Sequence, residues 1–261
     1  MRRNLYLMFL ALGFAVINYS SSFAEEPKEP AESNIPQLLS NESIPAEVRA
    51  ALPSITRVVA LRPNIIRNLF MPVKAGDGFV VGDHLVITCT HIIAIAEGEA
   101  DHTSYYVDTH KTQVEIQYDD KKYEADIVAY SPLFALLKVK DNTGSKFDKK
   151  PLPLSPLNLN DFQQGPLFAF AFVAPGVVFF KEFRYFSGYF IDRDINHGSV
   201  MERGTLSERI GDGYSGTPLL DSKGQCRGIL EGDYYESTIL IPADQIIEFL
   251  EKARKGLSDK K

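Results

Sequence analysis

The residues best suited to chemistry lie in one glycine-rich stretch, from Gly211 to Leu220. This stretch places Ser215 among three glycines and ends in a proline and two leucines. Glycine adopts backbone conformations that other residues resist, so such a turn can point successive main-chain N–H groups into one concavity. A concavity of this kind holds an anion or a developing oxyanion. The stretch therefore fits two structures, a nucleophilic serine beside its own oxyanion hole or an ordinary tight turn between strands.

A serine hydroxyl is a poor nucleophile until a base takes its proton, and His91 is the candidate base. It follows Thr88-Cys89-Thr90 at the end of an apolar, strand-like run. Taken alone, it is better explained as a structural histidine in a threonine-rich turn. The five histidines are scattered and the chain has no Cys-x-x-Cys pair, so we expect no zinc site.

Short apolar runs must position these residues, and from Ser54 onward they follow one another closely. Such spacing is typical of an all-β barrel or sandwich. A polar, proline-bearing stretch at 141–160 predicts a connection between two halves, and the second half repeats the style of the first. Isoleucine, phenylalanine and leucine at helical spacing then predict a C-terminal helix over about 243–255. The strand-like runs of the first half are 56–61, 78–82, 84–88, 104–107, 112–118, 121–125, 126–130 and 134–139.

The first residues predict export. A basic start at Met1–Asn4 precedes an apolar run from Leu5 to Ile17 and a polar segment that ends at Ala24. This is typical of a secretory signal peptide cut after Ala24, and the run is too short to span a bilayer. Residues 25–50, rich in Pro, Glu, Ser and Asn, predict a flexible leader. We therefore expect a secreted or periplasmic protein without a membrane span.

The net charge bears on binding partners, and the cysteine content bears on disulfide formation. The net charge of -6 does not favour nucleic acid, which needs a positive field. Cys89 and Cys226 would meet an oxidising compartment, where they either pair or remain as buried thiols. The sequence leaves both possibilities open, because pairing depends on the distance between their Cα atoms.

Several segments together resemble chymotrypsin-fold (trypsin-like) serine proteases, particularly the HtrA branch. Thr88-Cys89-Thr90-His91 is similar to the Thr-x-x-His segment of that family, and Gly76-Asp77-Gly78-Phe79 resembles the Gly-Ser-Gly-Phe strand before it. Further similar segments, in family order, are 125–128, 135–139, 165–176, 187–188, the Ser215 stretch and the ending from Ile241. The resemblance covers about residues 54–252.

This resemblance implies a fold of two six-stranded antiparallel β-barrels with a C-terminal helix. The protease domain would span 51–252, with the first barrel at about 54–140 and the second at about 160–242. It also implies an exported serine endopeptidase that needs no cofactor and acts on a polypeptide substrate. The chain ends soon after the helix, so we expect no PDZ domain of the kind usual in that branch.

Site roles follow from the same resemblance. Ser215 would be the nucleophile and His91 the general base, while the N–H groups of Gly213 and Ser215 would form the oxyanion hole. The primary substrate pocket would be lined by Arg209, Ile210 and Gly211. Ile210 would favour a small or medium aliphatic residue, whereas Arg209 pointing inward would favour an acidic one.

One departure from the family concerns the triad acid. Leu133 stands where the family places an aspartate, and the loop is about two residues short. Losing this carboxylate can cost roughly 10,000-fold in turnover. Three interpretations follow: an inactive relative that binds polypeptide or acts as a scaffold, a weak Ser-His dyad, or a carboxylate supplied from elsewhere.

Glu231 is the candidate for a substitute acid. In the family's strand order it falls where a Ser or Thr normally touches the missing aspartate, and its side chain is long. The alternative is a solvent-facing glutamate. Two smaller departures lie beside the nucleophile, where Tyr214 replaces a usual Asn or Asp and Thr217 replaces a usual Gly.

Overall fold

The computed structural model describes the chain from residue 42 to residue 258 with several gaps. The predicted signal peptide and most of the predicted leader lie outside these residues. No helix among the described residues is long and apolar enough to cross a membrane. The described ranges are 42–64, 69–97, 104–118, 121–141, 146–157, 166–174, 177–183, 186–194, 199–206, 213–234 and 237–258.

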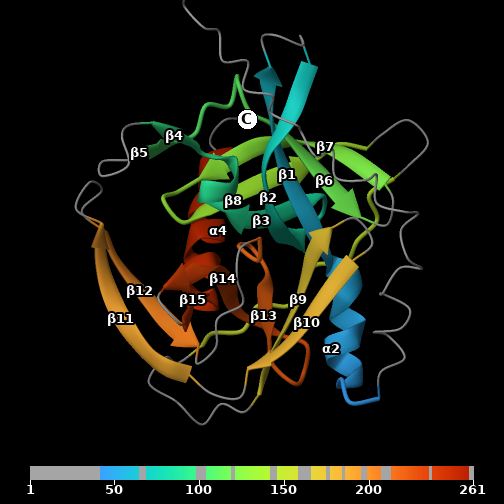
Figure 1. Ribbon diagram of the computed structural model, residues 1–261, viewed down its shortest axis with the longest axis vertical. Coiled ribbons are helices and arrows are strands. Elements are labelled where there is room, and N and C mark those ends of the chain that lie inside the picture. The colour runs from blue at the N-terminus through green and yellow to red at the C-terminus, as the bar shows by residue number, and fades with distance from the viewer. Residues whose placement is uncertain are drawn as a thin grey trace, which may run out of the picture. The chain divides into compact units, whose positions relative to one another are not determined.

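Six strands of the first half form a closed antiparallel barrel in the order β1-β2-β3-β8-β7-β6 (Figure 1). Their alternating or continuous apolar residues fill its interior, as expected for strands buried on one or both faces. A separate hairpin, β4 (Ile95–Glu97) with β5 (Ser104–Tyr106), follows the third strand. The barrel strands are β1 (Ile55–Asn64), β2 (Leu69–Gly82), β3 (Leu85–Cys89), β6 (Gln113–Tyr118), β7 (Lys121–Tyr130) and β8 (Phe134–Val139).

The second half forms one antiparallel sheet in the order β10-β9-β13-β14-β15-β12-β11. The predicted all-β, chymotrypsin-like fold with a C-terminal helix is therefore confirmed, with seven described strands in this second unit. Its strands are β9 (Leu167–Ala174), β10 (Val177–Phe183), β11 (Phe186–Asp194), β12 (Ser199–Leu206), β13 (Pro218–Leu220), β14 (Cys226–Tyr234) and β15 (Ser237–Pro242).

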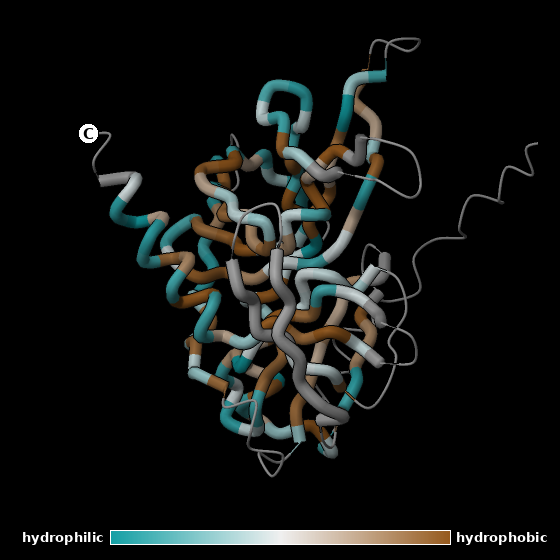
Figure 2. Tube along the Cα trace, turned by 90° about the vertical axis from the view of Figure 1, so that its left-hand side faces the viewer, coloured by the Kyte–Doolittle hydropathy of each residue, from teal (hydrophilic) through white to brown (hydrophobic). Residues whose placement is uncertain are grey.

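Helix α4 (Ala243–Ser258) follows the last strand and packs back onto the first barrel. Ile246, Leu250 and Ala253 are buried at the spacing of one helical face. Phe249 stacks at a tilt on Phe134 of β8, with 5.6 Å between ring centroids. In Figure 2 the helix carries both hydrophobic and hydrophilic residues along its length, as an amphipathic helix should.

The structure corrects the predicted leader, because its last part is folded. Helix α2 (Ala46–Ala51) and a 3-10 turn (Leu52–Ser54) precede the first strand. Ile44 and Val48 are almost fully buried in the main hydrophobic core. Val48, Ala51 and Leu52 lie on one face of the helix and its 3-10 extension, and Ile44 joins the same core from just before the helix. The composition of the segment hid this apolar spacing.

A single core joins the two halves. The largest cluster of buried residues includes Phe79 and Leu136 of the first barrel together with Phe170 and Ile229 of the second sheet. No disulfide joins Cys89 to Cys226, and both thiols are buried. Burial raises the pKa of Cys226 to about 12.

Candidate active site

The turn that contains Ser215, residues 213–217, leads directly into β13. We call it the nucleophile turn. Gly213 and Gly216 both have positive φ, at 94° and 90°, which only glycine adopts readily. A side chain at Gly216 would also collide with the main-chain oxygen of Asp77, whereas one at Gly213 would meet nothing within 4 Å. The two glycines predicted around Ser215 therefore serve a backbone path that other residues resist.

Hydrogen bonds hold this turn against both halves of the domain. The main-chain N–H of Asp77, on β2, donates to the carbonyl of Ser215 (2.7 Å). On the other side, the N–H of Gly216 donates to the carbonyl of Leu230 on β14 (2.8 Å). A side chain at Gly76 would meet the Ser215 carbonyl at 2.6 Å. Because glycine has no side chain, β2 can approach the turn this closely. Ser215 thus lies at the junction of the two β units.

The hydroxyl of Ser215 is half-buried and donates to the main-chain oxygen of Glu231 (2.6 Å). Glu231 lies at an irregularity in the pairing of β14 with β15, between Leu230 and Gly232. This places the carbonyl of residue 231, and not its carboxylate, at the hydroxyl.

His91 lies in a four-residue helix, α3 (Thr90–Ile93), which begins where β3 ends. Thr90 anchors this helix to the loop before β8, because its N–H donates to Leu133 O (2.9 Å) and its hydroxyl to Ser131 O (2.8 Å). Lys74, on β2, donates from Nζ to the main-chain oxygen of His91 (2.8 Å). These contacts fix the backbone of His91.

The imidazole of His91 is electrostatically unusual. Burial, and then the positive charge of Lys74, lower its pKa to about 4. The pKa of Lys74 is itself lowered by burial and by Arg62, which donates to Ala94 O (2.6 Å). His91 is therefore neutral at ordinary pH, the form that can accept a proton.

The structure brings the predicted residues to one region without completing a triad. Among the described residues, no hydrogen bond joins Ser215 Oγ to His91 and no carboxylate contributes to the pKa of His91. Leu133, at the expected aspartate position, is buried in the core beside α3. Gly213 is exposed. The predicted pocket residues Arg209, Ile210 and Gly211 lie outside the described residues.

Comparison with known proteins agrees with this geometry. The family model of the trypsin-like peptidase domain matches residues 76–229, more than half of the chain. The chain belongs to this family. No curated protein matches it.

The fold of this peptidase domain is shared with solved structures of the Rv3671c protease from M. tuberculosis. Its active form has 20% sequence identity and a TM-score of 0.58, covering 84% of this chain and 86% of that chain. An inactive form also has 20% identity, with a TM-score of 0.57 and coverage of 84% and 95%. At this identity the likeness extends to the fold alone.

Sequence analysis missed one functional candidate in the peptidase domain, Asp77. It is fully buried and its carboxylate accepts hydrogen bonds from Thr217 Oγ1 (2.7 Å) and from the N–H of Phe172 (3.1 and 3.2 Å). The signal was an aspartate between two glycines in an otherwise apolar strand. A charge on a strand buried on both faces demands specific partners.

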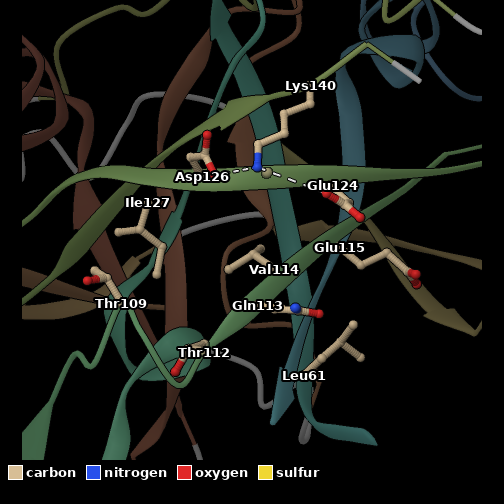
Figure 3. A pocket seen from close by; sticks show the side chains of 11 residues that line it. Leu61, Thr109, Thr112, Gln113, Val114, Glu115, Glu124, Asp126, Ile127 and Lys140 are labelled. Atoms are coloured by element: carbon tan, nitrogen blue, oxygen red, sulfur yellow. Dashed lines mark ion pairs between the residues drawn. The ribbon is translucent and has the colours of Figure 1, made fainter. Parts of the chain in front are cut away.

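A surface pocket of about 240 Å³ lies elsewhere, on the first barrel (Figure 3). It is lined by β6, β7 and the loop before β6, and it contains none of the predicted site residues. Asp126, in this pocket, forms an ion pair with Lys140 (2.7 Å). Among the described residues, no group of three His, Cys, Asp or Glu side chains is arranged to hold a metal ion.

Proposed function

We propose that this peptidase domain is a serine endopeptidase in which Ser215 is the nucleophile and His91 the general base. The observation that carries the proposal is the nucleophile turn itself. A serine stands on a two-glycine turn of positive φ, at the junction of two β units, in a chain of the trypsin-like family. The environment of His91 bears on this in two ways: burial and Lys74 keep the imidazole neutral, so that it can accept a proton, but a pKa of about 4 makes it a weak base.

The reaction would follow from these positions. Ser215 Oγ leaves the Glu231 carbonyl, transfers its proton to His91 and attacks the scissile carbonyl carbon. The N–H groups of Gly213 and Ser215 stabilise the resulting oxyanion. His91 then protonates the leaving amine as the carbon–nitrogen bond breaks, and water hydrolyses the acyl-enzyme by the reverse proton path.

Without an acid, the centre would work as a Ser-His dyad. A triad carboxylate orients the imidazole and stabilises its protonated form, and its removal can lower turnover roughly 10,000-fold. The buried Leu133 and the cation Lys74 both oppose formation of the imidazolium. We therefore propose weak turnover, with a substrate pocket formed by residues 209–211.

The remaining expectations from the sequence complete the proposal. The substrate is a polypeptide, and the protein is exported to the periplasm or beyond after cleavage following Ala24. Glu231 is retained as the candidate third member only in a state where its side chain rotates toward His91.

The second candidate is a catalytically impaired relative that binds polypeptide or acts as a scaffold. One specific observation favours it: the Ser215 hydroxyl donates to Glu231 O and not to His91. The surface around Ser215 would then bind a chain without cleaving it.

A fluorophosphonate probe separates the two candidates, because it reacts covalently with an activated serine. The endopeptidase should be labelled at Ser215, as located by mass spectrometry, and Ser215→Ala should abolish labelling. His91→Ala should slow it by about 1,000-fold or more. Folded protein, verified by circular dichroism, that resists labelling between pH 5 and 9 would favour the binding module.

A further inference from the structure

Asp77 touches the nucleophile turn at two points, Ser215 and Thr217. Its main-chain N–H donates to the carbonyl of Ser215 (2.7 Å), and its carboxylate accepts the hydroxyl of Thr217 (2.7 Å). One residue of the first barrel thus spans the segment that contains the nucleophile. We call the carboxylate of Asp77 with its donors, Thr217 Oγ1 and Phe172 N, the Asp77 latch.

The latch also joins the two β units through Phe172 on β9. Its N–H donates to the Asp77 carboxylate, and its carbonyl accepts a hydrogen bond from Arg57 Nη1 (2.7 Å). Arg57 lies on β1 directly opposite Asp77 in the strand register. Both main-chain polar groups of Phe172 are therefore held by this cross-strand pair.

The charged and titratable groups that face Asp77 are few. Arg57 on β1 favours the ionised carboxylate, and Tyr214 on the nucleophile turn has its pKa raised by burial and by the Asp77 charge. From β3, Thr88 contributes a hydroxyl that donates to the main-chain oxygen of Asp77 (2.6 Å). From β9, only the main chain of Phe172 contributes.

Burial dominates the ionisation of this carboxyl. It raises the pKa of Asp77 to about 7, although the hydrogen bonds from Thr217 and Phe172 and the charge of Arg57 act in the opposite direction. The pKa of Asp77 is higher in the folded chain than in the unfolded chain. Ionisation of Asp77 therefore lowers the stability of the fold as the pH rises from about 4 to 7, and the whole penalty is present above pH 7. Aspartates kept at such a cost are characteristic of functional sites.

Two departures from the family coincide at this contact. The resemblance places a serine where Asp77 stands, and a glycine where Thr217 stands. The structure joins the two replacements by a 2.7 Å hydrogen bond. A carboxylate on one side and a hydroxyl on the other form a bond that serine and glycine side chains do not make.

We propose that ionised Asp77 is a positioning residue that holds Ser215 for attack through Thr217, so that reaction at Ser215 depends on a second ionisation besides that of His91. The inference rests on the proposed endopeptidase function. It adds a group that touches neither substrate nor reacting atoms but acts through the turn.

Proton accounting identifies the ionised form as the one that fits. A carboxylate accepts from Thr217 and Phe172 at once, as observed. A protonated carboxyl keeps one acceptor oxygen but adds an O–H that needs an acceptor of its own, and Thr217 Oγ1 is the hydroxyl already at 2.7 Å. Thr217 would then have to turn its hydrogen elsewhere inside a fully buried site. Protonation thus loosens the bond between β2 and the nucleophile turn.

The test measures the rate of fluorophosphonate labelling of Ser215 from pH 3.5 to 9. Wild type should gain rate through a step near pH 7. Asp77→Asn should lose that step and react about 100-fold more slowly at pH 8, the order expected for a nucleophile displaced by about 1 Å. Thr217→Val should likewise lose the step and react slowly at pH 8, because Asp77 then has no hydroxyl through which to hold the turn, and Thr217→Ser should restore both. A matched control, Thr88→Val, removes a hydroxyl from the Asp77 main chain and should leave the midpoint unchanged.

Two results would overturn the inference: a step near pH 7 that persists in Asp77→Asn, or equal rates for wild type and Asp77→Asn at pH 8. Should Asp77→Asn fail to fold, a step near pH 7 that persists in Thr217→Val is decisive against it.

Wild type that never labels would instead contradict the proposed function. Hydrogen exchange of residues 213–220, corrected for intrinsic rates, then tests the latch by itself. Greater protection at pH 8 in wild type than in Thr217→Val, restored in Thr217→Ser, supports the latch. Equal protection in the three proteins contradicts it.

Discussion

The two sides of the candidate site are built differently. On the second-sheet side, Ser215 stands on a turn whose main chain and neighbouring side chains are fixed by Asp77, Leu230 and Glu231. On the first-barrel side, the backbone of His91 is fixed by Thr90 and Lys74, yet its imidazole has no carboxylate among the described residues. The nucleophile is held more completely than the base that must activate it. The leucine at position 133 therefore affects the proposed base, and leaves the turn around Ser215 intact.

The largest expected effect is on stability, and it comes from adding a side chain at Gly216, where the turn packs against Asp77. Gly216→Ala should lower the free energy of unfolding by about 3 kcal/mol or more, because the new methyl group combines positive-φ strain with overpacking against Asp77 O. Thermal and denaturant unfolding measure this loss.

Gly213→Ala is the matched control, since its φ is similar but its surroundings are open. It should cost only about 1–2 kcal/mol. Equal losses for the two variants would mean that the close approach of β2 does not hold the turn.

The next effect tests the base. The imidazole of His91 should titrate near pH 4 by NMR, far below the usual value for histidine. Because the unfolded chain binds a proton near pH 6.5 and the folded chain does not, His91 should destabilise the fold progressively between pH 6.5 and 4. The loss should total roughly 3 kcal/mol. His91→Gln should remove this part of the pH dependence.

A substitution of the neighbouring cation refines this test. Lys74→Met should raise the pKa of His91 by less than the burial contribution, since Lys74 is the smaller of the two causes. If the imidazole instead titrated above pH 6.5 in wild type, a carboxylate would have to lie beside it. The contrast between the two sides of the site would then disappear.

The smallest expected effect is at Glu231. Glu231→Gln keeps the main-chain carbonyl that accepts the Ser215 hydroxyl, so labelling of Ser215 and the titration of His91 should both be unchanged within about twofold. The measurements are the same probe assay and NMR titration. A large loss in Glu231→Gln would show that its carboxylate does serve as the third member.

Local patterns were sufficient for the fold and for the nucleophile turn. Alternating apolar runs predict strands, and the glycines around Ser215 predict a turn of positive φ, because both depend on neighbouring residues. The Asp77 latch could not be predicted from the sequence, since Asp77 and Thr217 are 140 residues apart and meet only when the two halves pack together. The helix around Val48 was missed because a polar composition masked three apolar residues at helical spacing.

The ionisation of His91 also could not be foreseen. It depends on how deeply the imidazole is buried and on Lys74, which comes from a neighbouring strand. Neither quantity is encoded in the Thr-x-x-His spacing. The sequence could show a leucine at position 133 where the family has an aspartate, but not that burial and Lys74 would lower the pKa of His91.

The helix before the first strand bears on how the protein is matured. Ile44 and Val48 pack into the same core as Ala253 near the far end of the chain, outside the matched residues 76–229 at both ends. A processing protease that cuts after Val48 would remove part of that core along with the leader. Cleavage that leaves the fold intact is thus confined to positions upstream of Ile44, and a shortened recombinant form should begin there or earlier.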